Sequence, residues 1–409
     1  MDISPAWRTR RALAVERERT RADRTGGLGV ERDADGYLYR PGQLLVGGAA
    51  VDELRSELGH DAVRSDDEVN HRFARRQVDV QKWLVRGDVH LPALQATLAR
   101  RVAGSGSHVE LNHVFAGEWY YEGGPATEPE LADTLPIPQG LSLSSPSPAI
   151  AVLDTGVTRP AHAYFAPVLV DDDGTDVDEL DEDGNSYLDT EAGHGTFICG
   201  LVQRLVPGLA MEQRKVLNAN GFGDDLTVAL GVAETSAPVL NLSLGGYTYR
   251  DRPPRALRAA LAALGPDRVV VAAAGNNART RAFWPAAFDR VIAVSAYDSA
   301  TGAPAPFSNH GPWVDVCAPG VDLHSCFVDG RRSADPSDAT FAGWAAWSGT
   351  SFAAPLVAAE IAHRVARSTS ERPAADVARE FVEELGERPG DGYGRRFTPS
   401  SDLRIPATT

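Results

Sequence analysis

The sequence predicts an α/β protein in which a doubly wound, mostly parallel sheet follows a small α+β domain. Its 409 residues exceed the size of one typical domain. From about residue 149 onward, short apolar runs rich in Val, Ile and Ala alternate with helical stretches, as in sheets of buried parallel strands. Between residues 43 and 115, strand and helix patterns instead follow the order β-α-β(β)-α-β.

These patterns divide the chain into five segments. A charged arm (1–42) precedes the small domain (43–115), and a linker (116–147) rich in Pro, Gly, Ser and Glu leads to the large domain (148–400). A short tail (401–409) ends the chain. The arm begins with basic residues, but no apolar stretch follows them, so we expect no secretory signal.

Periodicity supports each element of the small domain. QLLVGG and HVELNHVF are predicted strands, and QVDVQKWLVRG alternates as a strand does. VDELRSELG and LPALQATLARRV carry apolar residues at helical spacing, and the first of these ends in glycine. The order of these elements favours a ferredoxin-like, split βαβ sandwich.

In the large domain, the predicted strands are AIAVLDTGV, VLNLSLGG, RVVVAAAGN, RVIAVSAYD and WVDVCAPG. DLTVALGVAETS and PRALRAALAALG are predicted helices between them. Ligands of such sheets bind at the carboxyl ends of the strands. Asp154, Ser243 and Asn276 follow strand ends and are therefore candidate site residues.

Composition limits the partners. The net charge of −16 argues against nucleic acid and anionic membranes as partners, and no apolar run has the length of about 20 residues that a membrane helix needs. The three cysteines, too few for a disulfide framework, are predicted to be buried free thiols. Together with the missing signal, this favours a cytoplasmic location.

Four local motifs carry residues suited to catalysis. Asp154 stands in D-T-G after a buried strand, and His194 lies between two glycines in G-H-G-T. Ser351 opens a long apolar helix in G-T-S-F-A-A-P, and Asn276 ends a strand in A-A-G-N. Each residue alone also has a structural explanation as a turn, loop or helix-capping residue.

Taken together and in this order, the four motifs closely resemble those of the subtilisin-like serine proteases, over about residues 147–400. The resemblance implies a subtilisin-like fold and a serine endopeptidase that acts on protein or peptide substrates without a required cofactor. Asp154, His194 and Ser351 would form the triad, and Asn276 with the Ser351 amide would bind the oxyanion. A transpeptidase or cyclase using the same triad, or a pseudoprotease that serves as a binding scaffold, remains an alternative.

The resemblance also implies a substrate cleft. The peptide would pair with Ser243-Leu244-Gly245, and the opposite wall of the primary pocket would comprise Ala273-Ala274-Gly275. Asn277 follows the oxyanion residue, where the family often has a residue of the pocket floor. Phe283 stands where many members have glycine at the base of the pocket. Two interpretations remain open: Phe283 fills the pocket and favours small residues before the scissile bond, or it points into the core.

Between Asp154 and His194 lies an acidic insert with eleven carboxylates in 171–191. DEDGNSYLD resembles a calcium loop, but its glycine and last residue depart from the usual positions. The insert is a calcium site, a solvated loop or a site for basic substrate residues. The candidate ligands are Asp181, Asp183, Asn185 and Asp189.

The small domain resembles the propeptides of this family in its pattern of elements. The chain would then be made as a self-inhibited or self-processing zymogen, with cleavage in 116–147. The alternative is a permanently attached regulatory or binding domain.

Overall fold

The structure is a computed structural model that describes residues 29–76, 78, 80–116, 127–137, 145, 147–170, 174–368 and 372–400. The predicted arm 1–42 therefore lies largely, and the tail 401–409 entirely, outside the described residues. No helix in the described part of the chain is both long enough and apolar enough to cross a membrane.

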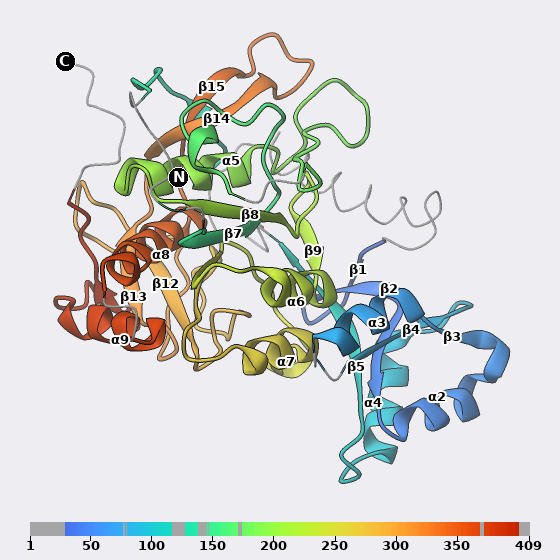
Figure 1. The fold of residues 1–409 in the computed structure, drawn as a ribbon. Helices are drawn as coiled ribbons and strands as arrows, with labels where there is room; N and C mark the ends of the chain where they lie inside the picture. Colours follow the sequence, from blue (N-terminus) through green and yellow to red (C-terminus); the bar gives the residue numbers. More distant parts are fainter. Residues whose placement is uncertain are drawn as a thin grey trace.

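A seven-stranded parallel sheet forms the centre of the large domain (Figure 1). Its order is β16-β13-β12-β11-β10-β7-β8, so β7 pairs with β8 on one side and with β10 on the other. After β7 the chain adds β8 on one side of it and then places β10 and the later strands on the other. This change of direction marks the switch point at which α/β sheets bind ligands. The strands are β7 (Ile150–Asp154), β8 (Met211–Lys215), β10 (Val239–Leu242), β11 (Val269–Ala273), β12 (Val291–Tyr297), β13 (Val316–Pro319) and β16 (Arg395–Arg396).

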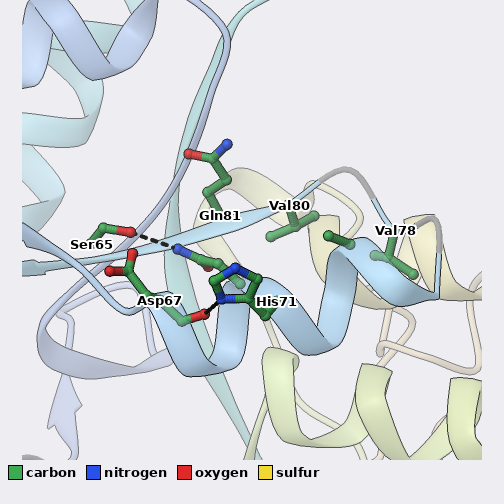
Figure 2. A pocket seen from close by; sticks show the side chains of 8 residues that line it. Ser65, Asp67, His71, Val78, Val80 and Gln81 are labelled. Atoms are coloured by element: carbon green, nitrogen blue, oxygen red, sulfur yellow. Dashed lines mark hydrogen bonds between the residues drawn. The ribbon is translucent and has the colours of Figure 1, made fainter.

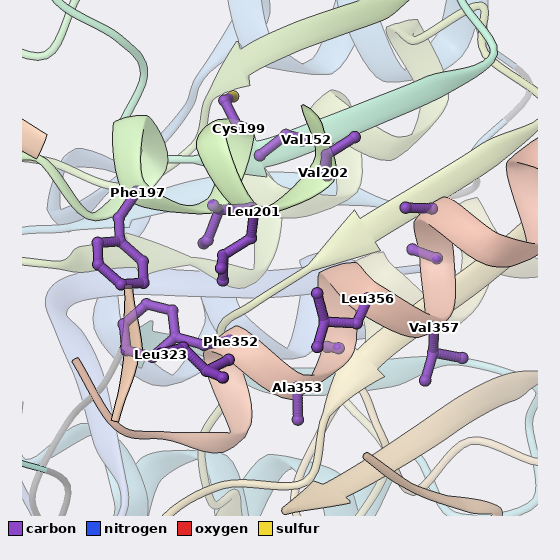
Figure 3. Close-up of a cluster of buried hydrophobic side chains, with 14 of the residues drawn as sticks. Val152, Phe197, Cys199, Leu201, Val202, Leu323, Phe352, Ala353, Leu356 and Val357 are labelled. Atoms are coloured by element: carbon purple, nitrogen blue, oxygen red, sulfur yellow. The ribbon is translucent and has the colours of Figure 1, made fainter. Parts of the chain in front are cut away.

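Helices cover both faces of this sheet because the strands are apolar on both sides. Along β7, Ile150 and Val152 belong to one buried cluster and Ala151 and Leu153 to the other. Helices α5 (His194–Leu205), α8 (Thr350–Arg367) and α9 (Ala374–Glu384) contribute to the first cluster. Figure 3 shows Phe197 and Leu201 of α5 close to Phe352 and Leu356 of α8. Helices α6 (Asp225–Glu234) and α7 (Arg255–Ala263) contribute to the second.

A three-stranded antiparallel sheet packs beside α5. Strands β14 (Leu323–Arg331) and β15 (Thr340–Trp347) form a hairpin, and β6 (Glu130–Leu131) pairs with β15. The predicted linker 116–147 thus contributes a short strand to the large domain; its residues 117–126, with the aromatic run WYY, lie outside the described residues.

The small domain has strands in the order β3-β4-β2-β5, each antiparallel to its neighbour. Helix α3 lies between β3 and β4 and was not predicted. The sheet also begins before residue 43, because β1 pairs with β2. The elements are β1 (Glu31–Arg32), β2 (Leu38–Gly47), α2 (Ala50–Leu58), β3 (Val63–Ser65), α3 (Asp67–Arg75), β4 (Gln81–Val85), α4 (Leu91–Arg101) and β5 (His108–Ala116).

The two domains share a sheet and a core. Strand β5 of the small domain pairs antiparallel with β9 (Phe222–Asp224) of the large domain. Phe115, at the end of β5, is fully buried in the cluster that also contains residues of α6 and α7. Arg40 and Asp224 form a buried ion pair between the domains, with 3.1 Å between Nε and Oδ2.

Candidate active site

Asp154 and His194 meet at the carboxyl end of β7. Asp154 is the last residue of β7, His194 is the first of α5, and His194 Nδ1 lies 2.7 Å from Asp154 Oδ1. The glycines of both motifs permit this approach. A Cβ atom on Gly195 would lie 2.4 Å from the carbonyl oxygen of Gly156, so a side chain at 195 would separate the two segments.

The electrostatics of His194 favour a charged imidazole despite its burial. The ring is completely buried, and desolvation lowers its pKa. The charge of Asp154 and the hydrogen bond between the two side chains outweigh this effect, so the net pKa is raised above its ordinary value of 6.5. The ring also lies edge-to-face against Trp347 of β15, with 5.5 Å between ring centroids.

Ser351 is the second residue of α8, where backbone amides lack partners within the helix. Its hydroxyl donates to the Ser243 carbonyl oxygen at 3.3 Å, while the Ser243 hydroxyl donates to the Ser351 carbonyl at 2.6 Å. His194 Nε2 has no hydrogen-bond partner in the described part of the chain. The base atom and the nucleophile are therefore not hydrogen-bonded to each other in this structure, as in many enzymes without substrate.

Asn276 follows β11, and its side chain is fixed by Thr350. The Asn276 Oδ1 atom accepts hydrogen bonds from the Thr350 amide and hydroxyl, both at 2.9 Å. The Thr350 hydroxyl in turn accepts the Gly275 amide at 3.0 Å. Because Oδ1 is the accepting end, the side-chain nitrogen is the end that donates, beside the first turn of α8.

The predicted cleft strand is already paired. Ala116, at the end of β5, exchanges two backbone hydrogen bonds with Gly245: its amide donates at 2.9 Å and its carbonyl accepts at 2.8 Å. On the other side of β5, the same residue pairs with Phe222 of β9. The end of the small domain thus lies between two segments of the large domain, as an added peptide strand would.

Phe283 lies between the two predicted walls of the primary pocket. A Cβ atom on Gly245 would approach the Phe283 Cε1 atom to 2.2 Å, and one on Gly275 would approach it to 2.9 Å. The ring is 6% exposed and packs edge-to-face on Tyr247. The cavity that Phe283 and Ala116 border has a volume of only about 20 Å³.

The other predicted cleft residues are buried around this ring. Asn277 accepts a hydrogen bond from the Tyr247 hydroxyl at 3.2 Å, and its amide donates to Asn309 Oδ1 at 3.1 Å. The Ala274 carbonyl accepts from Asn309 Nδ2 at 2.8 Å. Besides Phe283, the buried members of the predicted cleft are Ser243, Leu244, Gly245, Ala273, Ala274, Gly275 and Asn277.

The acidic insert brings three of its four predicted ligands together. Carboxylate oxygens of Asp181, Asp183 and Asp189 lie within 4.8 Å of one another. Asn185 donates its side-chain amide to Asp183 Oδ2 at 2.9 Å, and its Oδ1 accepts the Tyr187 amide at 2.8 Å.

Asp189 is the carboxylate of this cluster whose ionisation is most strongly disfavoured by its surroundings. It is 7% exposed, and its Oδ1 atom has no hydrogen-bond partner among the described residues. Burial, with the repulsion of Asp183, Glu182 and Asp181, raises the pKa of Asp189 to about 7.

A cavity of about 500 Å³ lies in the small domain between α3 and β4, where Figure 2 shows Asp67, His71, Val78 and Gln81 along its lining. His71 Nδ1 lies 2.6 Å from the Asp67 carbonyl oxygen, so the local backbone already engages this ring. This pocket brings together none of the predicted catalytic residues.

Sequence reasoning missed the residues that support the triad. Thr155 and Thr350 stand inside the motifs but were not assigned a role. Asp178 and Asn309 contact site residues from distant segments, and nothing in the local sequence distinguishes Asp178 from the other carboxylates of the insert.

Comparisons with known proteins identify the family of the chain. Residues 146–379 match the sequence profile of the subtilase family, peptidase S8. The thermophilic serine proteinase of Bacillus sp. strain AK1 is 31% identical over 325 residues, which cover 74% of this chain and 71% of that protein. Thermitase of Thermoactinomyces vulgaris is 32% identical over 235 residues, covering 54% of this chain and 76% of that protein.

Among solved structures, fervidolysin from Fervidobacterium pennivorans, described as a keratinolytic enzyme related to subtilisin, shares the fold. Its TM-score is 0.60 at 20% identity, over 89% of this chain and 61% of that chain. Because the family profile spans more than half of the chain and the Bacillus proteinase matches along most of both proteins, the chain belongs to the subtilase family and is a serine-type endopeptidase.

Proposed function

We propose that the chain hydrolyses peptide bonds through an acyl-enzyme formed on Ser351. The observation that carries this proposal is the 2.7 Å contact between His194 Nδ1 and Asp154 Oδ1 at the carboxyl end of β7, beside the start of α8. Three segments far apart in sequence bring a base, its carboxylate and a hydroxyl to one edge of the sheet, which is the arrangement that activates a serine.

In this mechanism, His194 Nε2 takes the Ser351 proton as the hydroxyl attacks the peptide carbonyl carbon. Asp154 holds the ring through Nδ1 and stabilises the imidazolium. The Asn276 side-chain amide and the Ser351 backbone amide stabilise the oxyanion of the tetrahedral intermediate. The imidazolium then protonates the leaving amine. Next, His194 deprotonates a water molecule, which attacks the acyl carbon, and the proton passes to Ser351 as the acid product leaves.

A fluorophosphonate probe tests this proposal. The wild-type chain should be labelled once its cleft is accessible, and Ser351→Ala should not be. Ser348→Ala is the matched control, because the Ser348 hydroxyl donates to Asp322 rather than to a predicted catalytic residue. Equal labelling of wild type and Ser351→Ala would exclude Ser351 as the nucleophile.

We further propose that the small domain inhibits the enzyme by occupying its own cleft. The paired strands β5 and β9, the two bonds between Ala116 and Gly245 and the burial of Phe115 support this proposal. The triad residues Asp154, His194 and Ser351 are at most 1% exposed in the chain that carries this domain. A peptide substrate would have to displace Ala116 before it could pair with Gly245.

The pairing register predicts where self-cleavage would fall. Ala116 lies opposite Gly245 in an antiparallel bridge, and Ser243, two residues earlier, contacts the Ser351 hydroxyl. An antiparallel strand that kept this register would bring residue 118 opposite Ser243. We therefore place the candidate scissile bond between Glu118 and Trp119, inside the predicted interval 116–147.

Intact masses of the wild-type and Ser351→Ala chains test this assignment. Wild type should yield fragments that end at Glu118 and begin at Trp119, whereas Ser351→Ala should stay intact. We propose that Phe283, which lies against Gly245 and Gly275, fills the primary pocket. A glutamate side chain would then fit there poorly, and Glu118→Ala should be processed faster. Cleavage of Ser351→Ala at the same bond would exclude self-processing.

Finally, we propose that the acidic cluster takes a calcium ion. The buried Oδ1 of Asp189 and the mutual repulsion of the carboxylates support a cation there, and calcium prefers oxygen ligands. Asp181, Asp183 and Asp189 would hold the ion. It would stabilise the insert that leads into α5 rather than take part in the reaction.

A further inference from the structure

The segment between Asp154 and His194 contains a second buried carboxylate, Asp178. It contacts the residue after Asp154 and the residue before His194. Asp178 is 3% exposed, and its backbone amide donates to the Val157 carbonyl at 3.0 Å, just after the D-T-G motif. Val157 and Val177 also form a parallel bridge. The backbone therefore fixes Asp178 against the turn that follows Asp154.

One oxygen of Asp178 joins the two catalytic motifs. Its Oδ2 atom accepts the Thr155 hydroxyl at 3.0 Å and the Gly193 amide at 2.8 Å. The Thr155 hydroxyl in turn accepts the Gly195 amide at 3.1 Å. The residues on both sides of His194 are thus tied to the residue next to Asp154, so the distance between the two catalytic side chains depends on this network.

Two charged groups interact with Asp178: Lys215 at the end of β8 lowers its pKa, and His194 at the start of α5 is influenced by its charge. Asp154, at the end of β7, and Glu191, in the turn before α5, act together with Asp178 on His194. The charge of Asp178 contributes to raising the pKa of His194. Burial raises the pKa of Asp178 itself to about 6, so the carboxylate is mostly ionised above pH 6.

From this geometry we propose that Asp178 is a positioning residue of the active site. It holds the Asp154 turn and the His194 turn in register through Thr155 and Gly193, and its negative charge supports the imidazolium. Asp178 does not touch the reacting atoms. The proposal rests on the proposed triad, because it assigns to Asp178 a task within that triad.

Two variants separate positioning from mere structural support. In Asp178→Asn, kcat should fall about tenfold to a hundredfold, the change expected for a weakened hydrogen bond to a charged group, with KM nearly unchanged. Thr155→Val should lower kcat in the same way, and Thr155→Ser, which keeps the hydroxyl, should restore it. Glu179→Gln is the matched control, because this neighbouring carboxylate has a largely exposed side chain.

The decisive measurement is the titration of His194 by NMR in full-length chains that carry Ser351→Ala. The pKa of His194 should be lower with Asp178→Asn than without it, and unchanged with Glu179→Gln. Unchanged titration and unchanged kcat in Asp178→Asn would overturn the proposal. If Asp178→Asn fails to fold, Thr155→Val with wild-type kcat would overturn it as well. A wild-type chain that a fluorophosphonate never labels would instead contradict the proposed function, while the titration would still decide the role of Asp178.

Discussion

We propose that Phe283 sets the specificity of the pocket through its volume. Its ring fills the space beside two glycines, Gly245 and Gly275, where any Cβ atom would collide with it. Gly245 of the proposed cleft pairs through backbone atoms, which bind a peptide strand without regard to its sequence. In this proposal, the choice of the substrate residue before the scissile bond depends on how much space the Phe283 ring leaves for its side chain.

We predict that Phe283→Ala changes the preference before the scissile bond from Gly, Ala and Ser to larger apolar residues. Removal of the ring opens the pocket, at a cost in stability of roughly 3–5 kcal/mol for a buried Phe. Cleavage profiles over a peptide library measure the change. Phe288→Ala is the control, because that ring packs on Trp284. Efficient cleavage after Phe, Tyr or Leu by the wild-type enzyme would contradict the prediction.

The residues of the proposed triad could be found in the sequence because close packing restricts their neighbours. Gly195 must lack a side chain to lie against Gly156, and Gly156 must lack one to lie against Asp176 of the insert, so the motifs carry a local signature. Asp178 carries none. It acts through a contact to Thr155, 23 positions away, and only the folded path of the insert selects it from eleven carboxylates.

At the scale of elements, the insert between β7 and α5 combines a buried network at Asp178 with a cluster of carboxylates farther along. The two are linked directly, because the Leu180 amide donates to Asp178 and the Leu180 carbonyl accepts the Asp189 amide. A change in the charge balance of the cluster should therefore alter the stability of the segment that enters α5.

We predict that calcium raises the melting temperature strongly at pH 8 and weakly at pH 5. The pKa of Asp189 is about 7 when folded and about 3.8 when unfolded, so the folded state binds more protons between these values. The contribution of Asp189 to stability therefore falls as the pH rises from 4 to 7, and a cation offsets the loss above pH 7.

Calorimetry with calcium and with EGTA measures this effect. Asp189→Asn should melt higher than wild type in EGTA at pH 8 and should lose the response to calcium. Glu383→Gln, which neutralises an exposed carboxylate of α9, should respond as wild type does. An identical melting temperature with calcium and EGTA at pH 8 would rule out the site.

Helix α7 depends on a side chain of another helix. Its N-terminal residue Arg255 follows two prolines, and no side chain of its own segment caps it. Asp225 of α6 accepts the amides of Ala256 and Leu257 at 2.9 and 2.8 Å. The buried carboxylate thus joins α6 to α7 on the face of the sheet shared with the small domain.

We predict that Asp225→Ala lowers stability by about 2–6 kcal/mol, because two buried amides lose their acceptor at roughly 1–3 kcal/mol each. Asp225→Asn keeps one accepting oxygen and should cost less. Urea unfolding followed by circular dichroism measures both variants. Equal midpoints for Asp225→Ala and wild type would show that water satisfies these amides.

The elements that could be predicted are those whose periodicity is strong. The apolar parallel strands β7, β10, β11, β12 and β13 and the helices α6 and α7 lie where the sequence predicts them. Helix α3, the parallel strands β8 and β16, the short strand β9 and the β14–β15 hairpin were missed. Strand β9 has three residues and exists because β5 lies beside it, so its partner, rather than its own sequence, determines its structure.

At the scale of the whole molecule, the small domain is attached through contacts with different pH dependence. Burial alone would raise the pKa of Asp224, but the charge of Arg40, with the Thr227 amide and Lys82, lowers it below its ordinary value, so this ion pair resists acidification. As the pH falls, the contact made by His113 of β5 should weaken before the Arg40–Asp224 ion pair does. It is 3% exposed, and its Nε2 atom accepts the Tyr249 amide of the large domain at 3.1 Å.

We predict that acidification loosens the small domain through His113. Burial lowers the pKa of His113 to about 3 in the docked state, whereas a released domain would expose a ring with an ordinary pKa of about 6.5. The released state then binds more protons between these values, so docking weakens as the pH falls below 6.5. For this group alone, the weakening reaches about thirtyfold at pH 5.

Hydrogen exchange at β5 and β9 in full-length Ser351→Ala measures docking without self-cleavage. After correction for intrinsic exchange rates, protection should fall about thirtyfold from pH 7.5 to pH 5. His113→Gln keeps an acceptor for the Tyr249 amide but cannot gain a charge, so its protection should hardly change. His71→Gln, at an exposed position on α3, should behave as the parent chain does. If His113→Gln showed the same loss of protection as the parent chain, the pH dependence would reside in other groups of the interface.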